Sequence, residues 1–223
     1  LMRYASVLPA LALLLCLPAV SADAGELGWR VRGFGALLSP DTSETTVNGD
    51  GDDILIEAGR GFGGGGDVEY QFHRHLGVDA GIVVASPEIT LSAEIAGLGA
   101  LSLPDKLTTA VFTGGVLVHL TPGSPIVDLY AGGGVAVVSP GGLSFDILGI
   151  ERLNVEGESY VTWSVRAGLD LSLGEDSPWA VSLGVRYIPG DIELRQLGVP
   201  ADDDSAEFGF NMLGFTAGVA YRF

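Results

Sequence analysis

The last eleven residues, 213-LGFTAGVAYRF-223, alternate between two kinds of side chain. Apolar residues occupy every second position from Leu213 to Phe223, whereas mostly small residues and Arg222 lie between them. Successive side chains of a β-strand point to opposite faces. This stretch therefore predicts a strand with one apolar face and one face of small or polar residues.

The same period-two pattern recurs along the chain and predicts an all-β fold. The eight expected strands cover residues 29–38, 59–72, 76–84, 107–120, 126–138, 161–172, 179–187 and 213–223. Three short turns (73–75, 121–125 and 174–177) alternate with four long connections (39–58, 86–106, 139–159 and 190–207). Short turns at one end and long loops at the other are typical of bacterial outer-membrane barrels. We therefore expect an eight-stranded antiparallel transmembrane β-barrel with short periplasmic turns and long extracellular loops.

The N-terminal segment has the features of a secretory signal peptide. Arg3 precedes an apolar run over residues 7–20, and Ala22-Asp23-Ala24 fits the small-x-small cleavage rule. The run is too short to cross a membrane as a helix. We expect residues 1–24 to be cleaved, which leaves a barrel domain of residues 25–223. The single cysteine, Cys16, lies in the cleaved part, so a disulfide framework is not expected.

Charge and hydropathy together favour a membrane barrel over a soluble one. The formal net charge is −17, which should repel nucleic-acid phosphates, yet the mean hydropathy is +0.39. A soluble lipocalin-type barrel is the structural alternative, but its outer face would carry many charged residues. Here the second face of each strand carries mainly Gly, Ala, Ser and Thr, which suit the narrow interior of eight strands. The apolar face should therefore contact lipid.

Isolated charges of both signs interrupt the small-residue face. Because a buried charge is tolerated only when it is paired, they predict an interior network of ion pairs that plugs the periplasmic half of the barrel. Its expected members are Arg30, Arg32, Asp67, Glu69, Asp79, Asp128, Arg166, Asp170, Arg186 and Arg222. Toward the extracellular end the same face turns apolar. The candidate channel-lining residues there are Leu38, Val83, Val138, Ile188, Phe210 and Met212.

Aromatic residues near strand ends on the apolar face predict interfacial girdles. They are Trp29, Tyr70, Trp163, Trp179, Tyr187, Tyr221 and Phe223. The terminal Phe223, with Tyr221 and Val219 alternating before it, resembles the signal read by outer-membrane assembly machinery.

Two motifs that suggest cofactors have simpler interpretations. Residues 61–66 match G-x-G-x-x-G, but a strand follows them rather than the helix that a dinucleotide site needs. The acidic stretch 48–53 lacks the glutamate ligand of a calcium loop. Neither a cofactor nor a metal site is expected. Whether the acidic loops bridge divalent cations to surface lipid stays open.

The histidines are poorly placed for an enzyme. Some eight-stranded outer-membrane barrels modify lipid A and need a base facing the outer leaflet. Here His73 and His75 lie in an expected periplasmic turn, and His119 lies near the same end of its strand. We therefore expect no enzymatic activity.

A proline follows each of the four strands that run toward the long loops: Pro40, Pro87, Pro140 and Pro189. The simpler interpretation is that the strands end there, because proline cannot donate to a ladder. The alternative is a local gap in the wall through which a lipophilic molecule leaves sideways. Apolar residues in the second and third long loops (such as Leu98 and Ile150) add a candidate capture surface.

The mature chain resembles the OmpW family of outer-membrane proteins. The resemblance rests on residues 29–40, Gly77-Val78-Asp79 with Ser86-Pro87, Leu103-Pro104, residues 129–134 and residues 210–223. It implies a narrow apolar channel for passive uptake of small hydrophobic molecules. As a barrel of the outer membrane, the protein is also expected to contact outer-membrane lipid, lipopolysaccharide and the assembly machinery. The glycine-rich second strand is not a distinctive feature of that family. A structural or adhesive barrel without transport, and a lipid A-modifying enzyme, remain the alternatives.

Overall fold

The computed structural model describes residues 28–42, 45–48, 53–95, 99–122, 124–147, 151–196 and 205–223. The expected signal peptide, its cleavage site and Cys16 lie outside these residues. So do the loop residues Leu98, Leu148 and Ile150 and the acidic stretches 49–52 and 202–204.

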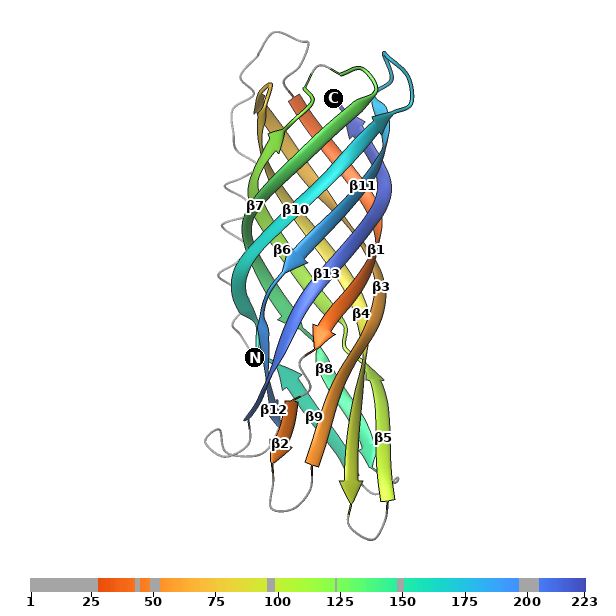
Figure 1. The fold of residues 1–223 in the computed structure, drawn as a ribbon, viewed down its shortest axis with the longest axis vertical. Helices are drawn as coiled ribbons and strands as arrows, with labels where there is room; N and C mark the ends of the chain where they lie inside the picture. Colours follow the sequence, from red (N-terminus) through yellow and green to blue (C-terminus); the bar gives the residue numbers. More distant parts are fainter. Residues whose placement is uncertain are drawn as a thin grey trace.

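Eight long strands close into an antiparallel barrel (Figure 1). They are β1 (Gly28–Thr42), β3 (Asp53–His73), β4 (Leu76–Ile95), β6 (Thr109–His119), β7 (Val127–Pro140), β10 (Tyr160–Ser172), β11 (Trp179–Ile188) and β13 (Ser205–Arg222). Each strand pairs with the next in this order, and β13 pairs with β1 from Arg222 opposite Arg30 to Phe210 opposite Thr42. Because this pairing closes the barrel, the described residues of β1 and β13 pair with each other along the seam and expose no sheet edge there. The predicted eight-stranded antiparallel barrel is confirmed.

The expected ends of several strands are wrong, because strands extend into the long connections. Five further strands lie there: β2 (Thr45–Asn48), β5 (Gly99–Lys106), β8 (Gly142–Ile147), β9 (Glu151–Gly157) and β12 (Asp191–Gln196). They continue the ladder beyond the barrel at the end opposite the short turns (Figure 1). Pairing in this way satisfies backbone N–H and C=O groups that an irregular loop would leave to water.

Pro87 shows why proline misled the strand boundaries. It lies inside β4, which runs on to Ile95, so the expectation that this strand ends before Pro87 is wrong. Its carbonyl accepts a hydrogen bond from the Leu107 N–H at 2.9 Å, and a bulge in β3 between Ala58 and Gly61 lies opposite. A bulge is one of the places where a sheet accommodates proline without losing the ladder.

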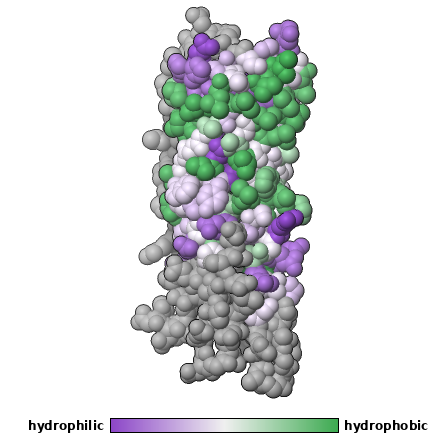
Figure 2. All heavy atoms as spheres, viewed as in Figure 1, coloured by the Kyte–Doolittle hydropathy of each residue, from purple (hydrophilic) through white to green (hydrophobic). Residues whose placement is uncertain are grey.

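The two faces of the wall differ as the alternation predicts. Large apolar side chains such as Trp163, Phe215 and Val219 are exposed on the outside, each by about half its surface (54%, 49% and 51%). Figure 2 shows hydrophobic residues gathered next to the hydrophilic turns at the upper end of the view. Two aromatic pairs lie at the short-turn end of this surface, with ring centroids 4.9 Å apart for Trp29–Tyr70 and 4.7 Å for Trp179–Tyr221. Within the described ranges, no helix is long and apolar enough to cross a membrane.

Candidate functional site

A network of buried charges fills the lumen on the side of the short turns; we call it the plug. Arg30 and Arg32, two positions apart on β1, both point inward and are almost fully buried. Arg30 donates to Asp170 Oδ2 and to Asp128 Oδ2, each at 2.7 Å. Arg32 donates to Asp67 at 2.9 Å, to Glu69 at 2.7 Å and to Asp170 at 3.1 Å. Each guanidinium thus donates to carboxylates of two other strands, which ties the wall together across the lumen.

His119, at the short-turn end of β6, contacts two of these carboxylates. Its Nε2 lies 2.6 Å from Glu69 Oε1, and its Nδ1 lies 3.0 Å from Asp128. Its side chain is fully buried. Arg222, on the last strand, donates to the same Asp128 at 3.1 Å from a side chain that is 45% exposed. The network therefore reaches the periplasmic mouth through Arg222.

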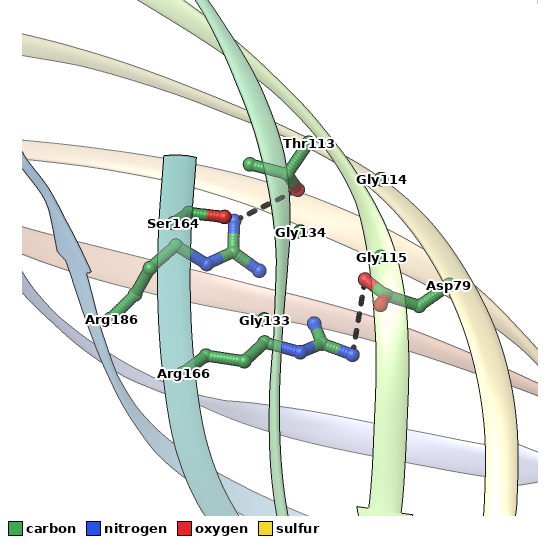
Figure 3. A pocket seen from close by; sticks show the side chains of 9 residues that line it. All are labelled: Asp79, Thr113, Gly114, Gly115, Gly133, Gly134, Ser164, Arg166 and Arg186. Carbon is green, nitrogen blue, oxygen red and sulfur yellow. Dashed lines mark hydrogen bonds and ion pairs between the residues drawn. The ribbon is translucent and has the colours of Figure 1, made fainter. Parts of the chain in front are cut away.

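A second layer lies farther from the short turns. Arg166 donates to Asp67 at 3.0 Å and forms an ion pair with Asp79 at 3.2 Å, while Arg186 donates to Thr113 at 3.2 Å. Figure 3 shows the two guanidinium groups extending from neighbouring strands toward β4 and β6. The cavities beside them measure about 10 and 20 Å³, room for about one water molecule each. These two cavities leave little room for water between the charged groups.

The ring of Tyr130 fills the space between the charged side chains of the plug. Its ring centre lies 4.7 Å from the Arg32 guanidinium carbon and 5.6 Å from that of Arg166. A side chain added at Gly168 would overlap this ring, so the glycine makes room for it. Cation–π attraction on a desolvated ring adds to the packing.

An apolar cluster lies above the plug, toward the extended hairpins. Leu38 is six residues beyond Arg32 on β1, roughly 20 Å along the strand. The cluster consists of Leu38, Ala85, Ile89, Leu107, Val111, Ala136, Val138, Ile188, Phe210 and Met212, with Ala58 and Tyr160 packed against it. Every member is at least 94% buried. Five of the six candidate channel-lining residues are members, and the sixth, Val83, is buried on the same inner face of β4.

The ladder beside this cluster is interrupted in two places. Pairing between β10 and β11 ends at Val165 with Tyr187, and the next pair on that side is Gly157 with Leu194, between β9 and β12. Pairing between β1 and β3 ends at Leu38 with Gly61, and pairing on β3 resumes with β2 at Ile56. Pro189 lies in the first interruption and Pro40 beside the second. Pro189 and Pro40 therefore lie beside a break in the wall, although Pro40 is paired with Met212 of β13 on its other side. Pro87 and Pro140 lie within paired strands.

Tyr160 fills the interruption between β10 and β11. Its ring lies where a side chain at Gly190 would otherwise be, and it packs against the apolar cluster. Its buried hydroxyl has no hydrogen-bond partner among the described residues. The ring therefore closes the gap by contact alone.

Sequence reasoning assembled the charged members of the plug but left out His119 and Tyr130. All ten charged residues face the lumen or its periplasmic mouth. The sequence pattern places His119 near the end of its strand but does not by itself place it on a face. Its parity with Val111, Thr113 and Leu117, all buried on β6, is the signal that would have placed it inside.

Val219, Tyr221 and Phe223, the candidate assembly signal, lie on the outer face of the closing strand. Phe223 is 77% exposed, and its N–H donates to the Trp29 carbonyl at 3.0 Å. The Tyr221 and Phe223 rings are 4.9 Å apart.

Comparison with known proteins identifies the family. A family model described as an outer membrane protein beta-barrel domain matches residues 9–223. No curated protein matches the sequence significantly.

Solved structures of outer-membrane proteins share the fold, and OprG, AlkL and Neisserial surface protein A are three of them. OprG from Pseudomonas aeruginosa superimposes with a TM-score of 0.62 at 17% identity, over 89% of this chain and 97% of OprG. AlkL, solved in DMPC lipid bilayers, gives 0.55 at 18% identity over 93% and 95% of the two chains. Neisserial surface protein A gives 0.50 at 14% identity over 88% and 97%. These matches are consistent with the OmpW-family resemblance of the sequence, and the chain belongs to the outer membrane protein β-barrel domain family and is a protein of the bacterial outer membrane.

Proposed function

We propose that the barrel takes up small hydrophobic molecules passively. The solute enters from the side of the extended hairpins, loses its water among the apolar cluster and leaves sideways into the membrane. The plug below stops water and ions from following. No cofactor takes part.

One observation gives the main support for this route. An apolar cluster lies above the ionic plug, and the wall beside that cluster is interrupted between β10 and β11. A hydrophobic solute gains free energy by entering an apolar space and loses it beside buried charges. The plug therefore makes a straight path to the periplasm unfavourable, and the interruption offers a path to lipid.

Reconstitution into liposomes tests uptake. Vesicles that contain the barrel should accumulate a small alkane or terpenoid faster than empty vesicles. Met212→Trp and Phe210→Arg place a bulky or charged group in the apolar cluster and should bring uptake down to the level of empty vesicles. Phe215→Trp, on the lipid-facing side of the same strand, is the matched control and should leave uptake unchanged. Equal rates with and without the wild-type barrel would reject transport.

The exit is tested separately at Tyr160. Tyr160→Ala removes the ring from the gap and should increase uptake, whereas Tyr160→Phe keeps the ring and loses only a hydroxyl without a partner among the described residues. Wild-type uptake by both variants, together with loss of uptake in the Phe210 and Met212 variants, would retain the lumen as the route and reject this exit.

The tight burial of the apolar cluster favours a structural or adhesive barrel as the second candidate. Its side chains exclude solvent, so a solute has to displace them. If the barrel is correctly folded and heat-modifiable but takes up no solute, the structural or adhesive function is supported.

We also propose that the barrel has no enzymatic activity toward lipid A. His73 is the last residue of β3 and His75 lies in the short turn after it, and both ring nitrogens of His119 contact carboxylates of the plug. Incubation with lipopolysaccharide should leave the mass of lipid A unchanged, and a loss or gain of an acyl chain would overturn this inference.

A further inference from the structure

The glycine run of β3 produces a groove on the outer wall that the transport proposal does not use. On β3 the side chains of Asp67 and Glu69 point inward, so Gly66 faces outward without a side chain. Ala80, on the neighbouring β4, contributes only a methyl group. Larger outward residues surround this bare area: Val31 and Val68 on one side, Ile82 and Phe112 on the other.

The groove has the size and lining of a ligand site. Its volume is about 520 Å³, within the range of roughly 300–1,000 Å³ usual for small-molecule sites. The surface that it exposes is almost entirely apolar. Because this wall faces the hydrocarbon of the membrane, the molecule at hand to fill the groove is a lipid acyl chain.

The position of the groove indicates which leaflet supplies the lipid. Trp29 and Tyr70 form its end toward the short turns, and their ring centres are 4.9 Å apart. Aromatic pairs of this kind lie at the level of the lipid headgroups. The groove therefore opens to the periplasmic leaflet, which consists of phospholipid.

A positive charge lies just beyond this aromatic pair. Arg74, exposed in the turn between β3 and β4, is four residues past Tyr70, roughly 13 Å along the chain. The turn is held in place, because Gln71 Nε2 donates to the Arg74 carbonyl at 2.9 Å and the His75 N–H donates to His73 Nδ1 at 3.2 Å. An arginine at the level of the lipid headgroups can form charge-assisted hydrogen bonds with a lipid phosphate.

The charge is specific to this turn. The turn at residues 121–125 carries no charged residue, and the one at 174–177 carries Glu175 and Asp176. In a chain of net charge −17, the one basic short turn thus lies directly below the apolar groove.

We propose that this face binds one anionic phospholipid of the periplasmic leaflet, with an acyl chain in the groove and its phosphate at Arg74. The site is separate from the lumen, and its occupancy does not depend on transport.

Native mass spectrometry of the mature barrel tests the proposal with phosphatidylglycerol and phosphatidylcholine of identical chains. Wild-type barrel should retain one phosphatidylglycerol in preference to phosphatidylcholine. Ala80→Leu fills the groove and should weaken retention of both lipids about tenfold. Arg74→Gln should abolish the preference, because it removes the charge that favours the lipid with a net negative headgroup. The matched controls are Ala217→Leu on the outer wall of β13 and Arg60→Gln far from the short turns, and both should behave as wild type.

A second measurement leaves the groove intact. In a chain with Trp163→Phe and Trp179→Phe, Trp29 is the only tryptophan, and phosphatidylglycerol with brominated acyl chains should quench its fluorescence more than brominated phosphatidylcholine does. Equal quenching by the two lipids, equal retention by all variants, or association of two barrels through this face in place of lipid would each overturn the proposal.

Discussion

At the scale of single residues, the plug depends on groups with several partners. Asp170 is 99% buried and accepts hydrogen bonds from both Arg30 and Arg32. If the Asp170 carboxylate loses its charge, the guanidinium groups of Arg30 and Arg32 stay buried in the lumen and lose one of the negative charges that they pair with. Breaking a buried ion pair is costly because the remaining charge stays desolvated.

Asp170→Asn should therefore lower the free energy of unfolding by about 3–5 kcal/mol. Asp176→Asn makes the same chemical change in an exposed short turn and should cost less than about 1 kcal/mol. Urea titration of the barrel in lipid vesicles measures both. Equal stability of the two variants would show that the plug does not hold the barrel together.

At the scale of elements, β6 and β7 approach each other so closely that inward side chains do not fit at some positions. A side chain at Gly134 would overlap the backbone of Gly114 and Gly115 on β6. At Gly33 on β1, by contrast, nothing lies within 4 Å of an added methyl group, because that position faces outward. Glycine is thus required at one position and only tolerated at the other.

Gly134→Ala should destabilise the barrel by about 1–3 kcal/mol, since the strands have to move apart. Gly33→Ala should be neutral or stabilise it by up to about 1 kcal/mol, because alanine restricts the unfolded chain. The same urea titration applies. The close approach of β6 and β7 would be refuted if both alanine variants unfolded at the same concentration.

At the scale of the whole molecule, the plug should decide whether ions cross the barrel. Tyr130→Ala removes the ring between Arg32 and Arg166 and should create a measurable ion conductance in planar bilayers, where the wild type should stay near the baseline. Tyr70→Ala removes the same ring from the outer girdle and should not conduct. A wild-type barrel that conducts as well as the Tyr130 variant would contradict a closed plug.

Assembly is the other property of the whole barrel, and it should depend on the last residue. Phe223 is 77% exposed to lipid, so Phe223→Ala should change stability by less than about 0.5 kcal/mol. In cells, however, it should reduce the heat-modifiable, outer-membrane fraction if the assembly machinery reads this end. Phe215→Ala, on the same face of β13, should assemble normally. Normal assembly of the Phe223 variant would reject the assembly signal.

The sequence by itself determined the barrel, its strand count and the two faces of its wall. In a membrane, strands with this period-two pattern have to pair all their backbone groups, and a closed barrel is the arrangement that does so. The sequence also predicted the charged residues of the lumen, since isolated charges on a face of small residues have to pair with one another. It does not determine where the strands end. Pro87 predicts a strand end, and only the register with β3 shows that a bulge accommodates this proline inside β4.

Only the tertiary structure decided which charges meet, that His119 joins Glu69 to Asp128, and that Tyr130 fills the plug. These contacts join residues that are far apart in the chain, such as Arg30 and Asp170, and depend on the stagger of eight strands around the lumen. The same holds for the groove beside Gly66 and the gap beside Tyr160. The alternation of residues along one strand shows which face of the wall a side chain points to. Which side chain of another strand lies opposite it across the lumen depends on how the barrel closes.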